Sequence, residues 1–153
     1  MIDTMRRRLR RARRSRPEAG IYEVPGDGDE QAVRVHVVDD DEDLREAIGF
    51  TLKSAGFAVA TAADGPAALT TIEAARPHLV VLDVMMPGPS GIEVCRRLRE
   101  DPGTASLPVI LLTARTSPAF RYAGLATGAN RHLLKPFDPS DLVTVIRELL
   151  HQD

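Results

Sequence analysis

The sequence predicts an α/β protein built on a doubly wound five-stranded parallel sheet flanked by five helices. From residue 33 onward, five short runs of β-branched and aliphatic residues alternate with five stretches whose apolar residues recur at intervals of three and four. Two of the strand-like runs, residues 79–82 and 109–112, are apolar at every position. Such runs are expected when helices cover both faces of a parallel sheet.

The first half of the alternation has clear strand and helix signals. Residues 33–38 are mostly β-branched and end in acids, which predicts a strand. A helical repeat over 44–55 is followed by Gly56, a residue suited to the left-handed position after a helix. A short strand is then predicted over 57–61, and Asp64-Gly65-Pro66 begins a helix that continues through Ile72.

The second half repeats the pattern three times, with proline, glycine or a capping residue at most boundaries. We predict strands at 79–82, at 109–112 after Pro108, and at 132–134. Each strand is followed by a predicted helix: the first around Ile92, Cys95 and Leu98, the second from Ser117-Pro118 to a possible end at Gly128, and the third over 138–150. Five such units in about 120 residues imply right-handed crossovers between parallel strands.

Charge divides the chain into three parts, although the formal net charge is only −2. Residues 1–16 hold eight arginines and one aspartate, whereas residues 17–32 hold five acids and no base, together with several Pro and Gly residues. The second stretch has too few apolar residues to form a core. We therefore predict a basic arm and an acidic linker without stable structure over residues 1–32, and one domain over residues 33–153.

Several classes of protein are disfavoured by composition. No apolar run approaches the ~18 residues that a membrane-spanning helix needs, and the arginine-rich start does not resemble a secretion signal. Cys95 is the only cysteine, so an internal disulfide and a cysteine-based zinc site are excluded. We expect a cytoplasmic protein, and we interpret Cys95 as a core residue.

Polar side chains follow four of the five predicted strands. Asp39 and Asp40 follow the first strand, Asp83 the third, Thr113 the fourth and Lys135 the fifth. Because the carboxyl ends of parallel strands lie at the same edge of a sheet, we expect these side chains to converge there.

Such a cluster favours metal-assisted phosphoryl transfer. Three adjacent carboxylates repel one another, and Mg²⁺ prefers oxygen ligands of this kind. Lys135 adds a second positive charge, and the hydroxyl of Thr113 can donate to a phosphoryl oxygen. The pattern therefore predicts a carboxylate nucleophile assisted by Mg²⁺.

Four segments together resemble the receiver domain of two-component response regulators, in particular single-domain chemotaxis receivers. They are VVDDDEDLR (37–45), LVVLDVMMPGPSG (79–91), PVILLTAR (108–115) and GANRHLLKPF (128–137). The resemblance implies a flavodoxin-like sheet with strand order 2-1-3-4-5. It covers the chain from Val33 to Leu150 and leaves out the first 32 residues.

The resemblance implies a role for each residue of the acidic edge. Asp83 would accept the phosphoryl group and ligate Mg²⁺, and Asp40 would ligate the ion directly. Asp39 would act mainly through a metal-bound water, and Met85 would supply a backbone carbonyl ligand. The side chains of Met85 and Arg115 would border the phosphoryl group, and we predict that they tune the rate of dephosphorylation.

The resemblance also implies a conformational switch. Thr113 and Lys135 would contact the phosphoryl group, and the Lys135–Pro136 peptide bond would be cis. Phosphorylation would draw Thr113 inward and let His132 turn into the space. That movement would remodel the surface of the fourth helix, fifth strand and fifth helix. Because His132 stands where tyrosine is commoner, we expect the switch to respond to pH near neutrality.

Three functions are weighed. The favoured function is a stand-alone receiver, which is a signalling domain and not an enzyme in the usual sense. It would take its phosphoryl group from a phosphohistidine on a sensor histidine kinase or a histidine phosphotransfer protein. It would then signal to a protein partner, and it could form a homodimer. The second is a Mg²⁺-dependent phosphatase with an aspartyl nucleophile, which is disfavoured because Met85 occupies the position of the usual acid. The third is a regulator whose arginine-rich arm binds nucleic acid or membrane.

Overall fold

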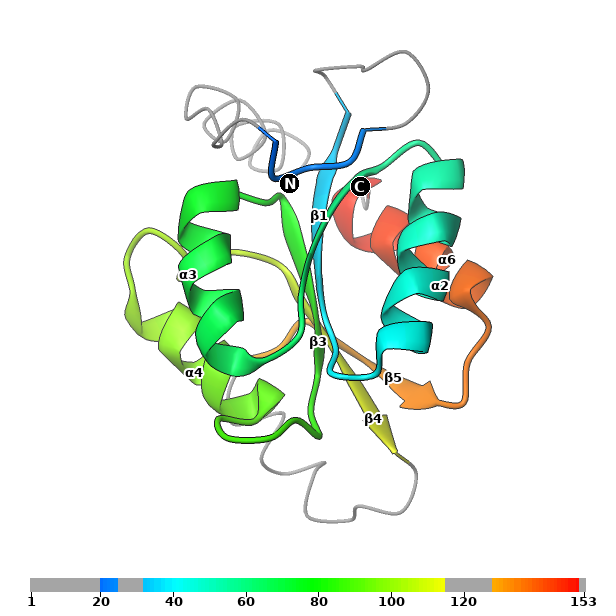
Figure 1. Cartoon of the computed structure of the whole chain (residues 1–153). Helices are drawn as coiled ribbons and strands as arrows, with labels where there is room; N and C mark the ends of the chain where they lie inside the picture. The colour runs from blue at the N-terminus through cyan, green and yellow to red at the C-terminus, as the bar shows by residue number, and fades with distance from the viewer. Residues whose placement is uncertain (1–19, 25–31, 115–127, 152–153) are drawn as a thin grey trace.

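The protein is described here by a computed structural model that covers residues 20–24, 32–114 and 128–151 (Figure 1). Strands and helices alternate along it, as the sequence predicts. In chain order they are β1 (Arg34–Val38), α2 (Glu42–Ser54), β2 (Ala58–Ala62), α3 (Gly65–Ala75), β3 (Leu79–Asp83), α4 (Gly91–Glu100), β4 (Val109–Ala114), β5 (Arg131–Lys135) and α6 (Pro139–His151).

The five strands form one parallel sheet in the order β2-β1-β3-β4-β5, which confirms the predicted fold class and strand order. Helices α2 and α6 cover one face, and α3 and α4 cover the other (Figure 1). Four of the five predicted helices lie in the described residues. The helix predicted from Ser117 to Gly128 lies outside them, apart from Gly128 itself.

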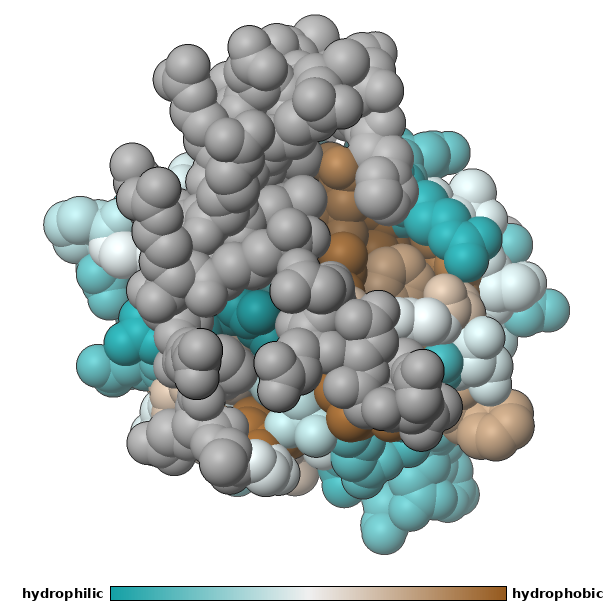
Figure 2. All heavy atoms as spheres, turned by 90° about the horizontal axis from the view of Figure 1, so that it is seen from above, coloured by the Kyte–Doolittle hydropathy of each residue, from teal (hydrophilic) through white to brown (hydrophobic). Residues whose placement is uncertain are grey.

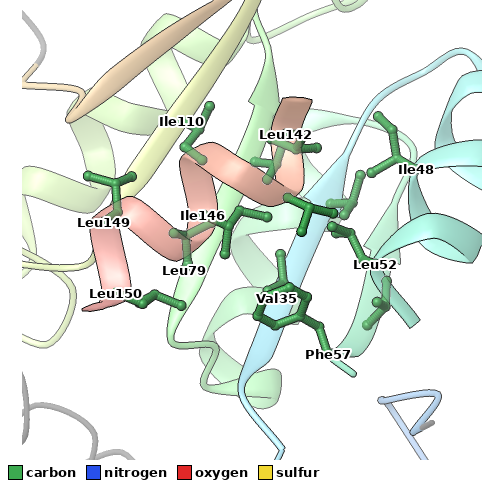
Figure 3. Packing of buried hydrophobic residues seen from close by; sticks show 14 of the residues in the cluster. Val35, Ile48, Leu52, Phe57, Leu79, Ile110, Leu142, Ile146, Leu149 and Leu150 are labelled. Atoms are coloured by element: carbon green, nitrogen blue, oxygen red, sulfur yellow. The ribbon is translucent and has the colours of Figure 1, made fainter. Parts of the chain in front are cut away.

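Two apolar clusters fill the space between the sheet and its helices. The first joins the sheet to α2 and α6, where Ile48, Leu142 and Ile146 have no exposed surface (Figure 3). The second lies on the opposite face and includes Val94 and Cys95, so the structure places the single cysteine in the core as expected. Burial on both faces explains why the central strands are apolar at nearly every position.

Three helices begin at a polar capping residue. Asp41, Asp64 and Ser90 accept hydrogen bonds from backbone N–H groups in the first turns of α2, α3 and α4, respectively. These bonds satisfy donors that a helix start would otherwise leave unpaired. The caps fix where each helix begins, and therefore the length of the loop that joins it to the preceding strand.

Residues 20–24, which fall within the predicted linker, lie against the edge of the sheet. Glu23 forms an antiparallel bridge with Val59 of β2. This differs from the expectation of a linker without structure over residues 17–32. The physical reason is that β2 is an edge strand whose outer backbone groups are available for pairing. The division of the chain into an arm, a linker and a domain otherwise stays a prediction.

Figure 2 looks onto the end of the molecule where the strands begin. Apolar surface is visible there beside strongly hydrophilic surface. Within the described ranges, no helix combines the length and the apolar character that crossing a bilayer requires.

Candidate functional site

Two aspartates follow β1 and differ sharply in exposure. Asp39 has no exposed surface, and its Oδ1 accepts a hydrogen bond of 2.9 Å from the backbone N–H of Asp41. Asp40 is exposed. The guanidinium of Arg45 donates to the backbone carbonyl of Asp39 at 2.8 Å, so the first turn of α2 holds the end of β1 in place. This role of Arg45 was not predicted, because an arginine in the first turn of a helix has no signal in the sequence that names its partner.

Asp83 is the last residue of β3 and is only 2% exposed. Its Oδ1 accepts a hydrogen bond of 3.3 Å from the backbone N–H of Met85, which fixes the carboxylate relative to the following loop. The loop returns so closely that a Cβ on Gly91 would lie 2.2 Å from the carbonyl oxygen of Asp83. A residue with a side chain cannot occupy this position without moving the backbone that carries Asp83.

Lys135 brings a positive charge to both buried carboxylates. Its Nζ lies 3.1 Å from Oδ1 of Asp83 and 3.3 Å from Oδ2 of Asp39. The lysine is the last residue of β5, so its side chain reaches past the end of β4 to the centre of the sheet. The ammonium group partly offsets the charge of two carboxylates that water cannot reach freely.

The three predicted acidic residues come together at one point. Carboxylate oxygens of Asp39, Asp40 and Asp83 all lie within 4.8 Å of one another. The donor set is entirely oxygen, and one of the three carboxylates faces solvent. These residues fit a hard divalent cation such as Mg²⁺, which binds through a few carboxylates and keeps several waters.

The electrostatics of the cluster follow from burial. Burial raises the pKa of Asp83, and the nearby charge of Asp39 raises it further, whereas the hydrogen bond and charge of Lys135 act in the opposite direction. For Lys135, burial alone would lower the pKa. The hydrogen bonds and charges of Asp83 and Asp39 outweigh that effect, so its pKa is raised and it stays an ammonium ion.

Thr113 lies at the same edge of the sheet, one position beyond the β4 residue that pairs with Asp83. It is 1% exposed, and its hydroxyl donates to the carbonyl of Ala114 at 3.3 Å. The hydroxyl is therefore near the carboxylates in the fold, but its hydrogen bond in this structure is to the backbone. The Lys135–Pro136 peptide bond is cis.

His132 pairs with Leu111 in the β4–β5 ladder and is partly buried. Burial lowers the pKa of its imidazole. This is at odds with the expectation of a response to pH near neutrality, because the charge change moves below the ordinary range of histidine. The sequence could not show this effect, since it depends on how tightly the ring is packed.

Of the two residues predicted to tune dephosphorylation, only Met85 lies in the described part of the chain. Met85 is 67% exposed beside Asp83, at the opening of the acidic cluster. Arg115 lies outside the described residues.

A pocket of about 330 Å³ adjoins the site and is lined by Asp41, Leu44, Lys135, Pro136 and Phe137. The sequence carries no signal for this pocket, because its walls come from two segments that are distant in the chain.

Comparison with known proteins places these features in a family. A sequence model of the response regulator receiver domain matches residues 35–147. The DNA-binding response regulator MtrA of Mycobacterium tuberculosis is 43% identical over 120 residues, which are 78% of this chain and 51% of MtrA. The response regulator MprA of the same species is 47% identical over 122 residues, which are 79% of this chain and 52% of MprA. The chain thus spans about half the length of these relatives.

Solved structures show the same similarity. The chemotaxis response regulator CheY4 of Vibrio cholerae superposes with a TM-score of 0.73 at 36% identity, covering 77% of this chain and 98% of that one. The receiver domain of sensor histidine kinase PA1611 from Pseudomonas aeruginosa, solved with a magnesium ion in its active-site cleft, gives 0.73 at 26% identity and covers 79% and 99%. The matched family, the sheet order and the acidic edge agree, and the chain belongs to the response regulator receiver domain family.

Proposed function

We propose that this chain accepts a phosphoryl group on Asp83 from a phosphohistidine, with Mg²⁺ as cofactor, and signals by a change of conformation. One observation carries the proposal: three carboxylates from two strand ends meet within 4.8 Å, and the Lys135 ammonium lies 3.1 Å from Asp83. A buried carboxylate with a cation beside it is an arrangement suited to phosphoryl transfer by positioning and electrostatics.

The proposed transfer uses Asp83 as the nucleophile. One of its carboxylate oxygens forms a bond to phosphorus, the phosphorus–nitrogen bond of the phosphohistidine breaks, and the electron pair stays on the imidazole nitrogen. Lys135 is placed to offset the charge of the incoming phosphoryl oxygens. Thr113 could reach one of them once its hydroxyl leaves the Ala114 carbonyl, which lies 3.3 Å away.

Mg²⁺ would be held by carboxylate oxygens of Asp40 and Asp83 and by the backbone carbonyl of Met85, with Asp39 acting through water. When bound, the ion would supply charge neutralisation for the transferred group. The all-oxygen cluster supports this assignment, as does the magnesium ion in the receiver domain of PA1611.

The output we propose depends on Thr113 and His132. Thr113 lies at the acidic edge, and His132 lies on the neighbouring strand β5, where it pairs with Leu111, two residues before Thr113. Movement of Thr113 toward a phosphoryl group would vacate space beside β5, into which the His132 ring could turn. The face that changes would be read by a protein partner or a second copy of the chain.

The cellular setting remains part of the proposal. We propose a sensor histidine kinase or a histidine phosphotransfer protein as the donor, and the cytoplasm as the site of action. MtrA, about half of whose length this chain matches, is described as DNA-binding. Stand-alone action through a protein partner is therefore an inference of ours, as is any role of the arginine-rich residues 1–16 in binding nucleic acid or membrane.

Incubation of the full chain with Mg²⁺ and a small phosphodonor, followed by intact-mass measurement, tests the proposal. We expect one added phosphoryl group on the wild type and on Asp43→Asn, an exposed acid in the first turn of α2. We expect none on Asp83→Asn, or when a chelator is present. Labelling of Asp83→Asn at the wild-type rate would refute the phosphoacceptor assignment, and sustained release of inorganic phosphate from simple phosphate esters would favour the phosphatase.

Met85 offers a test of the proposed control over dephosphorylation. Its side chain is 67% exposed at the opening of the site, where it can hinder the approach of water. We expect Met85→Ser to shorten the lifetime of the phosphorylated form several-fold without changing the stoichiometry of labelling. Arg115→Ser provides the second variant, and an unchanged half-life in both would remove the idea.

A further inference from the structure

The outer edge of β2 carries backbone groups that the sheet itself does not use. β2 pairs with β1 on its inner side, and within the sheet it has no other neighbour. Val59 is bonded on the opposite side: its N–H donates to the carbonyl of Glu23 at 3.0 Å, and its carbonyl accepts from the N–H of Glu23 at 2.9 Å. Residues 20–24 therefore form a short strap along this edge.

The strap is held by side chains as well as by backbone. Glu23 forms an ion pair with Lys53 in the last turn of α2. The ring of Tyr22 lies 5.9 Å from the guanidinium carbon of Arg34 in β1, within the range of a cation–π interaction. Arg34 is itself fixed by two bonds to the carbonyl of Arg76, at 3.0 and 2.7 Å. The strap thus touches β2, α2 and β1.

The edge that the strap covers is prone to pairing. β2 reads Ala-Val-Ala-Thr-Ala and carries no charge. An uncharged edge strand with unpaired backbone groups is a template for another chain, and proteins commonly protect such edges with a charged residue or a covering segment. The strap supplies a covering segment and also a charged residue, because Glu23, which pairs with Val59 of β2, carries a carboxylate.

We infer that residues 20–24 close the β2 edge from within the same chain and thereby prevent two copies from pairing through β2. The strap lies toward the beginning of β2, since Val59 is the second residue of that strand, whereas Asp83 lies at the carboxyl end of β3. The strap can therefore be opened without disturbing the acidic cluster, and the inference stands independently of phosphoryl transfer.

Glu23→Pro in the full chain removes the N–H that bonds to Val59, and Glu23→Gln is the matched control that keeps this N–H but removes the charge. The Val59 amide donates to the carbonyl of residue 23, which proline keeps, so its hydrogen exchange reports whether the strap stays in place once the other bond is lost. The amide of Val81 in the central strand is an internal reference. We expect Glu23→Pro to speed exchange at Val59 at least about tenfold in dilute solution and to leave Val81 unchanged. Circular dichroism verifies that the variant remains folded.

Sedimentation over a range of concentrations tests the second half of the inference. We expect Glu23→Pro to self-associate where the wild type does not, and Thr61→Lys, added on the exposed side of β2, to reverse this. Equal exchange at Val59 in wild type and Glu23→Pro would show that the strap does not close the edge. Fast exchange in a Glu23→Pro protein that stays monomeric would show that the edge needs no such protection. Association that Thr61→Lys does not reverse would show that the copies do not pair through β2, and either result would overturn the inference.

Discussion

His36 is a titratable residue at the centre of β1 with no exposed surface. The Thr71 hydroxyl donates to the carbonyl of Ala67 at 2.7 Å, so it accepts from Nε2 of His36 across the 2.8 Å that separate them. Burial is the main cause that lowers the pKa of His36 to about 4. The imidazole of His36 is therefore neutral in the folded sheet near pH 7, and its protonation in acid would oppose folding because the ring is buried.

We predict that His36 makes the fold less stable in mild acid. Because the unfolded chain binds the proton near the ordinary pKa of 6.5 and the folded chain only near 4, stability is full above pH 6.5 and falls as pH drops toward 4. Between pH 7 and pH 5 the loss should be about 2 kcal/mol from this residue. Urea unfolding of wild type and His36→Gln at both pH values measures it, and equal losses in the two proteins would contradict the prediction.

Gly91 lets the loop after β3 pass close to the backbone of Asp83, because it has no side chain. A Cβ there would lie 2.2 Å from the carbonyl oxygen of Asp83, whereas a Cβ on Gly103 would meet only a side-chain oxygen of Asp101 at 3.4 Å. We expect Gly91→Ala to cost about 2 kcal/mol or more of unfolding free energy, because the backbone must move. Gly103→Ala, measured in the same unfolding assay, should stay within about 0.5 kcal/mol. Similar effects at both positions would argue against the close approach.

At the scale of elements, Arg99 connects the end of α4 to the start of β5. Its guanidinium donates to the carbonyl of Gly128 at 3.1 Å and to Oδ1 of Asn130 at 3.0 Å. The same Oδ1 accepts from the backbone N–H of Val109 at 2.9 Å, at the start of β4. One planar group thus joins α4 to the segment that leads into the strand carrying His132 and Lys135.

We predict that Arg99→Lys loosens the start of β5, because a single ammonium group cannot reproduce the planar fork. Hydrogen exchange at the Asn130 amide, which bonds to the carbonyl of Val109 at 2.9 Å, should rise by about tenfold. Arg96→Lys is the matched control, since Arg96 is exposed and forms its ion pair with Glu93 on the same helix. An Asn130 amide that exchanges equally in both variants would show that the fork is dispensable.

At the scale of the whole molecule, the proposed Mg²⁺ site would couple cation binding to folding. A ligand that binds only the folded state raises stability, by about 2.7 kcal/mol at a hundred times its Kd. We expect Mg²⁺ to raise the midpoint of thermal unfolding of the wild type and of Asp43→Asn. Asp40→Asn, which removes the exposed carboxylate of the cluster, should largely lose this shift. A shift of equal size in Asp40→Asn would place the ion elsewhere.

The fold and the location of the candidate site were predictable from short-range sequence patterns and from the rule that the carboxyl ends of parallel strands lie at one edge of a sheet. Apolar runs marked the strands, capping residues marked the helices, and parallel strand order then brought Asp39, Asp83 and Lys135 to one edge. The contacts of Arg45 with Asp39 and of Gly91 with Asp83 were not predictable, because they depend on distances between segments. The same holds for Glu23, whose partner on β2 is 36 positions away.

If Asp83 accepts the phosphoryl group as we propose, its burial restricts what could deliver that group. With 2% of its surface exposed and a lysine against it, the carboxylate would favour a narrow projecting donor. An imidazole ring at the tip of a side chain meets that requirement, and so does a small free phosphodonor, whereas a phosphate ester held flush on a broad protein surface does not. On this proposal, the burial of the acceptor would select donors by shape before any partner-specific contact is made.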